Sequence, residues 1–176
     1  MRKLSMEELN RPSVEEFKES PKIPLVIILD NVRSMNNVGS AFRTSDAFAV
    51  EKIYLTGITA TPPHRDIHKT ALGAEESVSW QHAESTLALV KELQAQQYLV
   101  YAIEQAQERI WLQDFQPVAN QKYAFVFGNE VFGVDEEVMK LVNGCLEIPQ
   151  VGTKHSLNIS VSMGIAIWDF YKKVAF

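Results

Sequence analysis

Short apolar runs that end abruptly at polar residues constrain the fold of this chain more than any other feature. The clearest are LVIILD at Leu25–Asp30 and YAFVFG at Tyr123–Gly128. A continuous apolar run, without alternation, is typical of a β-strand buried on both faces. Such strands need a covering layer on each side, so we expect a sheet sandwiched between helices.

The rest of the chain alternates between strand-like and helix-like patterns. Further strands are expected at Lys52–Gly57, Ser77–His82, Tyr98–Glu104 and Cys145–Gln150. Helices are expected at Val38–Phe48, at Thr86–Gln97, between Asp135 and Asn143, and at Asn158–Tyr171. This alternation predicts the α/β class, with a mostly parallel sheet and helices on both faces. In such sheets ligands bind beyond the carboxyl ends of the strands.

The chain of 176 residues has the length of one domain. We expect residues 1–24 to form a peripheral N-terminal extension and residues 25–176 to form the domain. Ser13 and Glu16 have the spacing of a capping box, which predicts a short helix over Val14–Glu19.

Composition excludes several classes of protein. A net charge of −5 argues against a histone-like protein held to nucleic acid by bulk charge. The single cysteine, Cys145, excludes an intrachain disulfide and a Cys-rich zinc site, and we expect it to be a core residue. No apolar run has the length of a membrane span, and the N-terminus lacks a secretory signal. We therefore expect a cytoplasmic protein without a membrane partner.

Several cofactor motifs are missing. The sequence contains neither a G-x-G-x-x-G fingerprint nor a Walker phosphate loop. His64 and His68 have the spacing of a zinc motif, but Arg65 stands where the general base is needed. We expect no metal there and interpret the segment as a polar surface loop.

Polar residues follow the expected strands in three segments. In the first, Asn31–Thr44, Asn37 can cap a helix, Gly39 permits a close approach, and Arg43 is expected near the face that carries Asn37. Taken alone, this segment is better explained as a plain helix cap followed by a surface arginine than as a functional site.

The other two segments follow later strands. In Phe127–Val134, Asn129 and Glu130 stand at the sheet edge and Gly133 permits a sharp turn. In Ile148–Val161, Gly152 allows tight backbone geometry, and Ser156 and Asn158 can cap the final helix; the three segments together predict a site.

These residues resemble a known family. The patterns are Asn37-x-Gly39-x-x-x-Arg43-Thr44, Gly128-Asn129-Glu130-x-x-Gly133 and Ile148-Pro149 with Gly152 and Ser156-Leu157-Asn158-x-Ser160-Val161. In order and spacing they are similar to the three motifs of the SpoU (TrmH-like) branch of the SPOUT RNA methyltransferases. The resemblance covers roughly residues 25 to 171.

The resemblance implies an enzyme that methylates a ribose 2′-hydroxyl in tRNA or rRNA, with S-adenosylmethionine as methyl donor and no metal. It also implies a C-terminal trefoil knot. The donor is then held by the second and third motif loops and the loop after the Tyr98–Glu104 strand. The residues carried over as cofactor-binding are Ile103, Gly128, Asn129, Ile148 and Leu157.

The resemblance also assigns catalytic roles. Arg43 corresponds to the family's catalytic arginine, and Asn37 is expected to hold it. Because a guanidinium stays protonated in proteins, Arg43 is either a phosphate-assisted base or an electrostatic partner of the phosphate and the developing alkoxide. Glu130 is expected to orient Arg43 or the ribose, and Ser156 and Asn158 to shape the hydroxyl's pocket.

Partners follow from the same resemblance, which implies a homodimer. The apolar stripe Ile159, Met163, Ile167 and Phe170 of the final helix is a candidate interface, with burial against its own sheet as the alternative. RNA contacts are expected from exposed cations of the motif loops and the His64–Lys69 segment, for which an ordinary solvated loop is the alternative. The candidates are Arg33, Arg65, Lys69 and Lys154.

Three functions remain open at this point. The first is an RNA ribose 2′-O-methyltransferase. The second is a non-catalytic RNA-binding or assembly module on the same fold, which donor binding would separate from the first. The third, a nucleotide-binding enzyme of another chemistry, is disfavoured by the missing glycine-rich motifs. An aromatic side chain such as Phe132 or Trp111 is available to stack on an RNA base.

Overall fold

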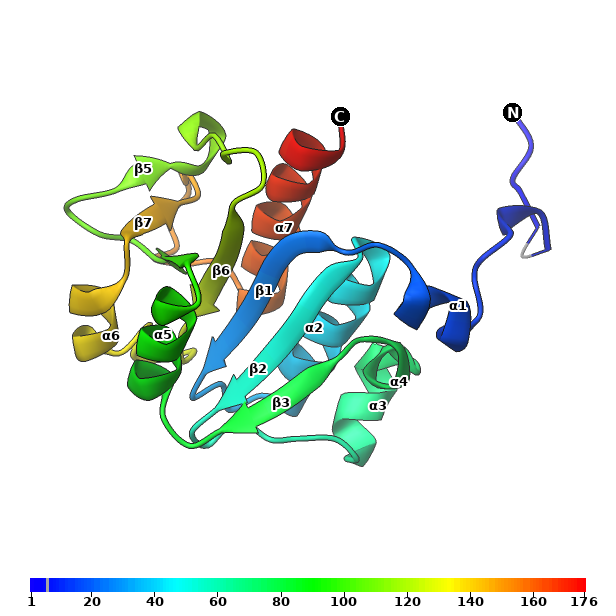
Figure 1. Ribbon diagram of the computed structural model, residues 1–176, viewed down its shortest axis with the longest axis horizontal. Coiled ribbons are helices and arrows are strands. Elements are labelled where there is room, and N and C mark those ends of the chain that lie inside the picture. Colours follow the sequence, from blue (N-terminus) through cyan, green and yellow to red (C-terminus); the bar gives the residue numbers. More distant parts are fainter. Residues whose placement is uncertain (6) are drawn as a thin grey trace.

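The computed structural model describes residues 1–5 and 7–176. Its centre is a seven-stranded sheet in the order β3-β2-β1-β6-β4-β7-β5 (Figure 1). Neighbouring strands pair in parallel throughout, which confirms the predicted sheet. The strands are β1 (Ile23–Asp30), β2 (Val50–Thr56), β3 (Trp80–Ala83), β4 (Tyr98–Ile103), β5 (Ile110–Trp111), β6 (Lys122–Phe127) and β7 (Gly144–Glu147).

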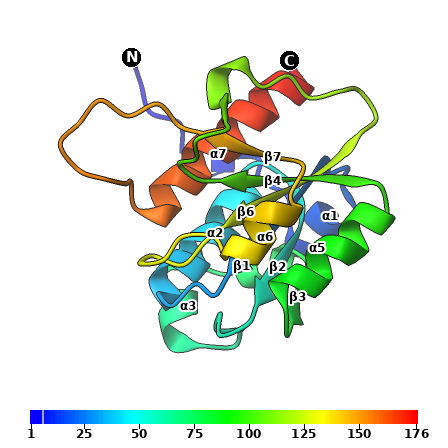
Figure 2. The same cartoon turned by 90° about the vertical axis from the view of Figure 1, so that its left-hand side faces the viewer.

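Helices cover both faces of this sheet. They are α1 (Val14–Glu19), α2 (Met35–Ala47), α3 (Arg65–Ala71), α4 (Ala74–Ser77), α5 (Thr86–Ala95), α6 (Glu136–Leu141) and α7 (Ile159–Ala175), with 3₁₀ turns η1 (Glu7–Leu9) and η2 (Leu112–Asp114). Figure 2 shows α2 and α7 on one side of the sheet and α5 and α6 on the other.

Successive side chains of the central strands pack alternately into two separate hydrophobic cores, one on each face of the sheet. In β1, Leu25, Ile27 and Leu29 pack in the cluster that includes residues of α2 and α7. Val26 and Ile28 point the other way, into the cluster that includes residues of α5 and α6. This two-sided burial is the physical reason for the unbroken apolar run.

The predicted surface loop at His64–Lys69 was wrong, because this segment lies in helix α3. The Nδ1 atom of His64 accepts a hydrogen bond from the Asp66 backbone N–H at 3.1 Å and so caps the helix. Ile67 is fully buried, and a Cβ atom at Gly39 of α2 would lie 2.2 Å from its carbonyl oxygen. Tertiary packing against α2 therefore stabilises a seven-residue helix that has little stability of its own.

One strand boundary also differs from expectation. The predicted strand at Ser77–His82 begins only at Trp80, because Ala74–Ser77 forms α4 after Leu72 and Gly73 adopt positive φ angles. Helix α3 is thus joined by α4 as an element that was not expected. Helix α6, in contrast, lies within its expected bounds, with Asp135 as N-cap and Val142 as C-cap, and the Asn143 backbone N–H that follows donates to the Val100 carbonyl oxygen at 2.7 Å.

The predicted dimer stripe on the final helix was wrong as well. Met163, Ile167 and Phe170 have no exposed surface, and Ile159 is 9% exposed, because these side chains pack in the core of their own subunit. The apolar residues that α7 exposes are Val161, Ile165, Trp168 and Val174.

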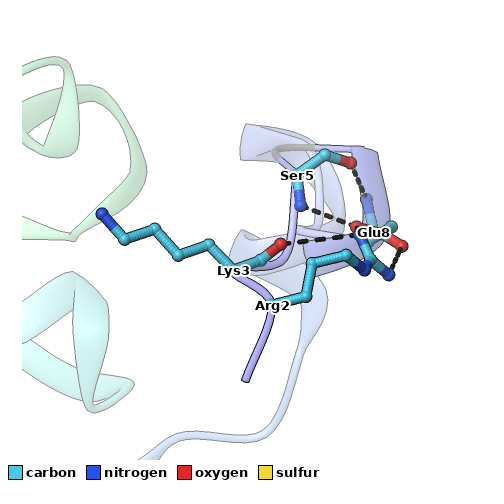
Figure 3. A network of polar contacts seen from close by, with 4 residues as sticks. All are labelled: Arg2, Lys3, Ser5 and Glu8. Carbon is cyan, nitrogen blue, oxygen red and sulfur yellow. Dashed lines mark hydrogen bonds and ion pairs between the residues drawn. The ribbon is translucent and has the colours of Figure 1, made fainter.

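The N-terminal segment forms the predicted helix α1, including the full capping box between Ser13 and Glu16. The Phe17 side chain of this helix is buried in the core cluster on the α2 side of the sheet. Before α1, the Glu8 carboxylate pairs with Arg2 at 2.7 Å and accepts the Ser5 backbone N–H at 2.7 Å (Figure 3). These contacts lower the pKa of Glu8 to about 2.

Cys145 lies in β7 and is 4% exposed, which confirms the expected core position. Desolvation is the main reason that the pKa of its thiol rises to about 11. Among the helices of the described residues, none has both the length and the apolarity for a membrane crossing.

Candidate functional site

Glu130 joins the loop after β6 to the loop after β1. Its Oε2 atom accepts the Arg33 backbone N–H at 3.0 Å, and its Oε1 atom accepts the Ser34 N–H and the Asn37 side-chain amide at 3.0 Å each. Desolvation raises the pKa of this carboxyl, but these hydrogen bonds outweigh it, so the pKa lies below its ordinary value. The carboxylate is therefore charged at neutral pH.

The loop after β6 is closed on itself. Asn129 and Gly133 exchange two backbone hydrogen bonds of 2.9 Å each. The Asn129 side chain accepts the backbone N–H groups of Val131 and Phe132 at 2.9 and 3.2 Å and donates to the Asn31 carbonyl oxygen at 2.8 Å. The loop is thus fixed both internally and to the end of β1.

Two glycines make this loop geometry possible. Gly133 has a φ of +71°, a region that glycine adopts without steric cost. A Cβ atom at Gly128 would lie 2.1 Å from the Gly133 carbonyl carbon and from the Val134 nitrogen. Gly128 is therefore required by the folding of its own loop.

Glu104, directly after β4, holds the same loop from the other side. Its Oε2 atom accepts the Val134 backbone N–H at 3.3 Å, and its Oε1 atom accepts the Gln105 N–H at 2.9 Å. Sequence reasoning pointed to this loop only through Ile103. The available signal was a carboxylate directly after an apolar strand, the same signal that Asp30 and Glu130 give.

Asp30, at the end of β1, organises the edge of the sheet beneath these loops. It is 1% exposed. Its Oδ1 atom accepts the Thr86 hydroxyl at 2.6 Å and the Asn31 side-chain amide at 2.9 Å, and its Oδ2 atom accepts the Asp135 backbone N–H at 3.0 Å. The Asp30 side chain thus connects the starts of α5 and α6 to β1.

The third segment runs from β7 to α7 over exposed residues. Asn158 caps α7, because its side-chain oxygen accepts the Ser160 backbone N–H at 2.8 Å. The Gln105 side chain donates to the His155 carbonyl oxygen at 2.6 Å. This contact ties the third segment to the loop after β4. A Cβ atom at Gly152 would meet nothing within 4 Å, so the expected need for tight geometry at that residue was wrong.

The three loops surround a cavity of about 710 Å³ at the carboxyl ends of β4, β6 and β7. Every residue assigned to the donor by resemblance lines it, namely Ile103, Gly128, Asn129, Ile148 and Leu157. Glu130, Ser156 and Asn158 line it as well. Residues that the sequence did not indicate complete the wall, among them Glu104, Gln105, Met139, Glu147 and Ser162.

Two residues of the first motif lie outside this cavity lining. Asn37 is 8% exposed, and the hydrogen-bond partner of its side-chain amide is Glu130, not Arg43. Arg43 is exposed further along α2, so it does not share the face of Asn37 as expected. Within residues 1–5 and 7–176, no side-chain hydrogen bond or ion pair involves Arg43.

The expected RNA-contacting cations are all exposed but are distributed over two regions. Arg33 lies beside Glu130, and Lys154 lies in the segment before α7. Arg65 and Lys69 lie on α3, where Arg65 lines a second cavity with Pro63, Trp80 and the His68–Glu75 pair. In the described part of the chain, no cluster of His, Cys, Asp or Glu has the composition of a metal site.

Comparison with known proteins places this geometry in context. Residues 24–168 match the model of the SpoU rRNA Methylase family. The tRNA (guanosine(18)-2′-O)-methyltransferase of Thermus thermophilus is 28% identical over 163 residues, covering 92% of this chain and 81% of that protein. The 23S rRNA (guanosine-2′-O-)-methyltransferase RlmB of Vibrio parahaemolyticus is 26% identical, covering 92% of this chain and 64% of that protein.

A tRNA/rRNA methyltransferase of Synechocystis is 26% identical over 89% of this chain, and the chain spans 57% of that protein's length. Two solved structures share the fold, each with a TM-score of 0.80. They are a TrmH/SpoU tRNA modifying enzyme of A. aeolicus, 22% identical over 91% of this chain and 80% of that one, and an AdoMet-bound rRNA methyltransferase from Sinorhizobium meliloti, 23% identical over 89% and 59%. With the family model matching residues 24–168 and these structures sharing the fold, the chain belongs to the SpoU rRNA methylase family.

Proposed function

We propose that this protein transfers a methyl group from S-adenosylmethionine to the ribose 2′-hydroxyl of a tRNA or rRNA nucleotide. One observation carries the proposal: the cofactor-binding residues of the family motifs line one cavity, and Glu130 ties that cavity to the first motif. Two relatives are named as 2′-O-methyltransferases, of tRNA and of 23S rRNA, and a neighbouring structure is described as AdoMet-bound.

The cavity suits such a donor. Its volume of about 710 Å³ lies within the usual range for small-molecule sites, roughly 300–1,000 Å³. Bound S-adenosylmethionine supplies an electrophilic sulfonium methyl group, which needs neither a metal nor an acid in order to leave. Ile103, Gly128, Asn129, Ile148 and Leu157 are the residues that would hold it.

The protein's own task is then to align the ribose hydroxyl and to assist the loss of its proton. Ser156 and Asn158 line the cavity and would border the hydroxyl. The oxygens of Glu130 already accept three hydrogen bonds from the first motif. We therefore assign Glu130 to holding the first motif in place, with Asn37 as its side-chain partner.

We assign Arg43 to the developing alkoxide and the neighbouring phosphate, where a fixed positive charge lowers the barrier. Because Arg43 lies outside the cavity lining of its own subunit, the active form is proposed to be a homodimer in which Arg43 of one subunit serves the cavity of the other. The exposed apolar residues of α7 are then the candidate interface.

Two further assignments belong to the same proposal. The segment from β6 to α7 is proposed to form a trefoil knot, supported by the insertion of β6 between β1 and β4 and of β7 between β4 and β5. Exposed Arg33, Lys154, Arg65 and Lys69 are proposed to contact RNA phosphates. Because tRNA and rRNA are the proposed substrates, we assign the reaction to the cytoplasm.

Titration of the purified protein with S-adenosylmethionine, without RNA and in the presence of EDTA, tests the foundation of this proposal. We expect saturable binding with one donor per subunit. RNA binding without donor binding would instead favour a non-catalytic module. Mass-spectrometric mapping of ribose methylation in a deletion strain and its parent would then identify the nucleotide, and identical maps would argue against the proposed reaction.

A further inference from the structure

A large aromatic side chain is exposed to solvent at the edge of the candidate donor cavity. Phe132 is 85% exposed and its neighbour Val131 is 67% exposed. Both belong to the loop after β6, and both line the cavity. Leaving an aromatic ring in water forgoes the free energy of its burial, so a ring kept in this position calls for a partner that covers it.

The backbone that carries the Phe132 ring is held in place by hydrogen bonds. The Phe132 backbone N–H donates to Asn129, and Glu130, two residues earlier, is held by the loop after β1. On the other side, Gly133 exchanges two backbone hydrogen bonds with Asn129. The loop after β6 is therefore pre-organised, and it carries the exposed Phe132 side chain at the cavity.

The surroundings of Phe132 indicate the chemistry of that partner. The backbone N–H of Arg33 donates to Glu130, so the exposed residue Arg33 lies beside the same loop. A bare aromatic face beside a cation is the combination that binds an unpaired nucleotide, because the base stacks on the ring and the phosphate pairs with the cation.

The other candidate aromatic is already occupied. The guanidinium of Arg109 lies 4.4 Å from the centroid of the Trp111 ring, and it is held there by an ion pair with Glu147 at 2.8 Å. Trp111 is also only partly exposed. Of the two aromatics, Phe132 is the one whose face is open.

We propose that Phe132 is a stacking platform for an unpaired base of the RNA substrate at the mouth of the donor cavity. By holding that base, Phe132 acts as a positioning residue for the ribose to be methylated and takes no part in the chemistry. This inference rests on the proposed RNA methyltransferase function, because it assigns the RNA side of the same site.

The test compares Phe132→Ala, Phe132→Leu and Phe132→Tyr with the wild-type protein, using RNA extracted from a strain that lacks the gene. We expect the Ala and Leu variants to raise the Kd and the KM for RNA about tenfold to a hundredfold, the usual loss for one stacked base. Phe132→Tyr keeps the ring and should stay near the wild type. The rise in the KM for RNA should exceed any change in the rate at saturating RNA, which separates a contact with the substrate from a general loss of the fold.

Val118→Ala is the matched control, because Val118 is 65% exposed but lies before β6, at the opposite end of the sheet. It should leave RNA affinity unchanged. Wild-type RNA affinity in the Phe132→Leu variant would overturn the stacking assignment, since leucine retains apolar bulk without a ring. Loss of the dimer in sedimentation of Phe132→Ala would overturn it too, because the ring would then belong to an interface between copies.

The outcomes also separate this inference from the function on which it rests. If the wild type binds RNA but transfers no methyl group, the proposed function fails. The Kd for RNA of the Phe132 variants still tests the stacking inference in that case. If the wild type transfers methyl groups and all the Phe132 variants match it, the stacking inference alone fails. If the wild type binds no RNA, both fail.

Discussion

At the scale of single residues, Glu130 determines how the site is assembled. One carboxylate accepts hydrogen bonds from two backbone N–H groups and one side-chain amide of residues that lie 93 to 97 positions away in the sequence. Glu130 is itself an exposed residue, yet these bonds keep its pKa below the ordinary value. The first motif therefore depends on the second for its position.

Replacing Glu130 by Gln tests this dependence. The substitution replaces one carboxylate oxygen by an NH2 group, which can only donate. That group would face another donor, so the three hydrogen bonds that Glu130 accepts cannot all survive. We expect a loss of about 1 kcal/mol of unfolding free energy, at the low end for charged hydrogen bonds because the group is exposed. Urea denaturation at pH 7 measures it, with Glu108→Gln, an exposed residue before β5, as the control.

The same pair of proteins gives a pH test. A carboxyl whose folded pKa is lowered stabilises the fold above its unfolded pKa, and that contribution is lost as the pH falls toward the folded value. The stability difference between wild type and Glu130→Gln should therefore be constant near neutrality and shrink below about pH 4.3. A difference that grows on acidification would contradict the role of the charged form.

Arg43 gives the chemical prediction at this scale. Arg43→Ala should lower single-turnover methylation at least about a hundredfold, because both an electrostatic contact and a base are worth that much or more. Donor affinity should change little, since Arg43 does not line the cavity. Arg43→Lys should also fail, because lysine lacks the planar fork. Near-normal rates for Arg43→Ala would reduce Arg43 to an ordinary surface residue of α2.

The sequence was sufficient to select residues but not to assign their contacts. The residues expected to hold the donor, around Gly128 and Leu157, line one cavity, as the family resemblance implied. The partner of Asn37 could not be predicted, because the contact joins loops from opposite halves of the chain. Likewise, the close approach that makes Gly128 necessary is to the Val134 backbone, which only the folded loop reveals.

At the scale of elements, local signals predicted what local physics determines. The two-sided burial of β1 and β6 and the capping box of α1 were readable because each leaves a direct mark on the sequence. Helix α3 left no such mark, because it forms by packing on α2. This is a tertiary effect that overrides local propensity.

Gly39 tests the contact that creates α3. A Cβ atom there would lie 2.1 Å from the Thr70 hydroxyl and 2.2 Å from the Ile67 carbonyl oxygen. Although alanine favours helices over glycine, Gly39→Ala should destabilise the protein by about 1–3 kcal/mol through overpacking. Thermal and urea unfolding measure this effect. Gly152→Ala, where a Cβ atom meets nothing within 4 Å, is the control and should not destabilise. An unchanged midpoint for Gly39→Ala would contradict the packing.

At the scale of the whole molecule, the separation of Arg43 from the cavity makes a homodimer the central expectation. Val161, Ile165 and Trp168 are 48%, 38% and 47% exposed and follow one another at helical spacing on α7. Ile165→Asp should turn a dimeric sedimentation profile at micromolar concentration into a monomeric one and abolish methylation. A wild type that sediments as a monomer would contradict this arrangement.

A mixing experiment checks that the site is shared between subunits. Arg43→Ala leaves the donor cavity intact, and Leu157→Arg blocks the cavity but retains Arg43. If each site combines residues of both subunits, mixed dimers of these two inactive variants should regain activity. The failure of the mixture to regain activity, while both variants still form dimers, would place Arg43 and the cavity of one subunit in the same site.

Methyl transfer by the purified protein tests the central claim most directly. The protein is incubated with S-adenosylmethionine, labelled in the methyl group, and RNA from a strain that lacks the gene, and the RNA is then digested to nucleosides for mass spectrometry. The account predicts label in a single 2′-O-methylated nucleoside, formed with EDTA present and at least about a hundredfold more slowly by Arg43→Ala. Label on a base, or no transfer to any RNA by a protein that binds the donor, would contradict it.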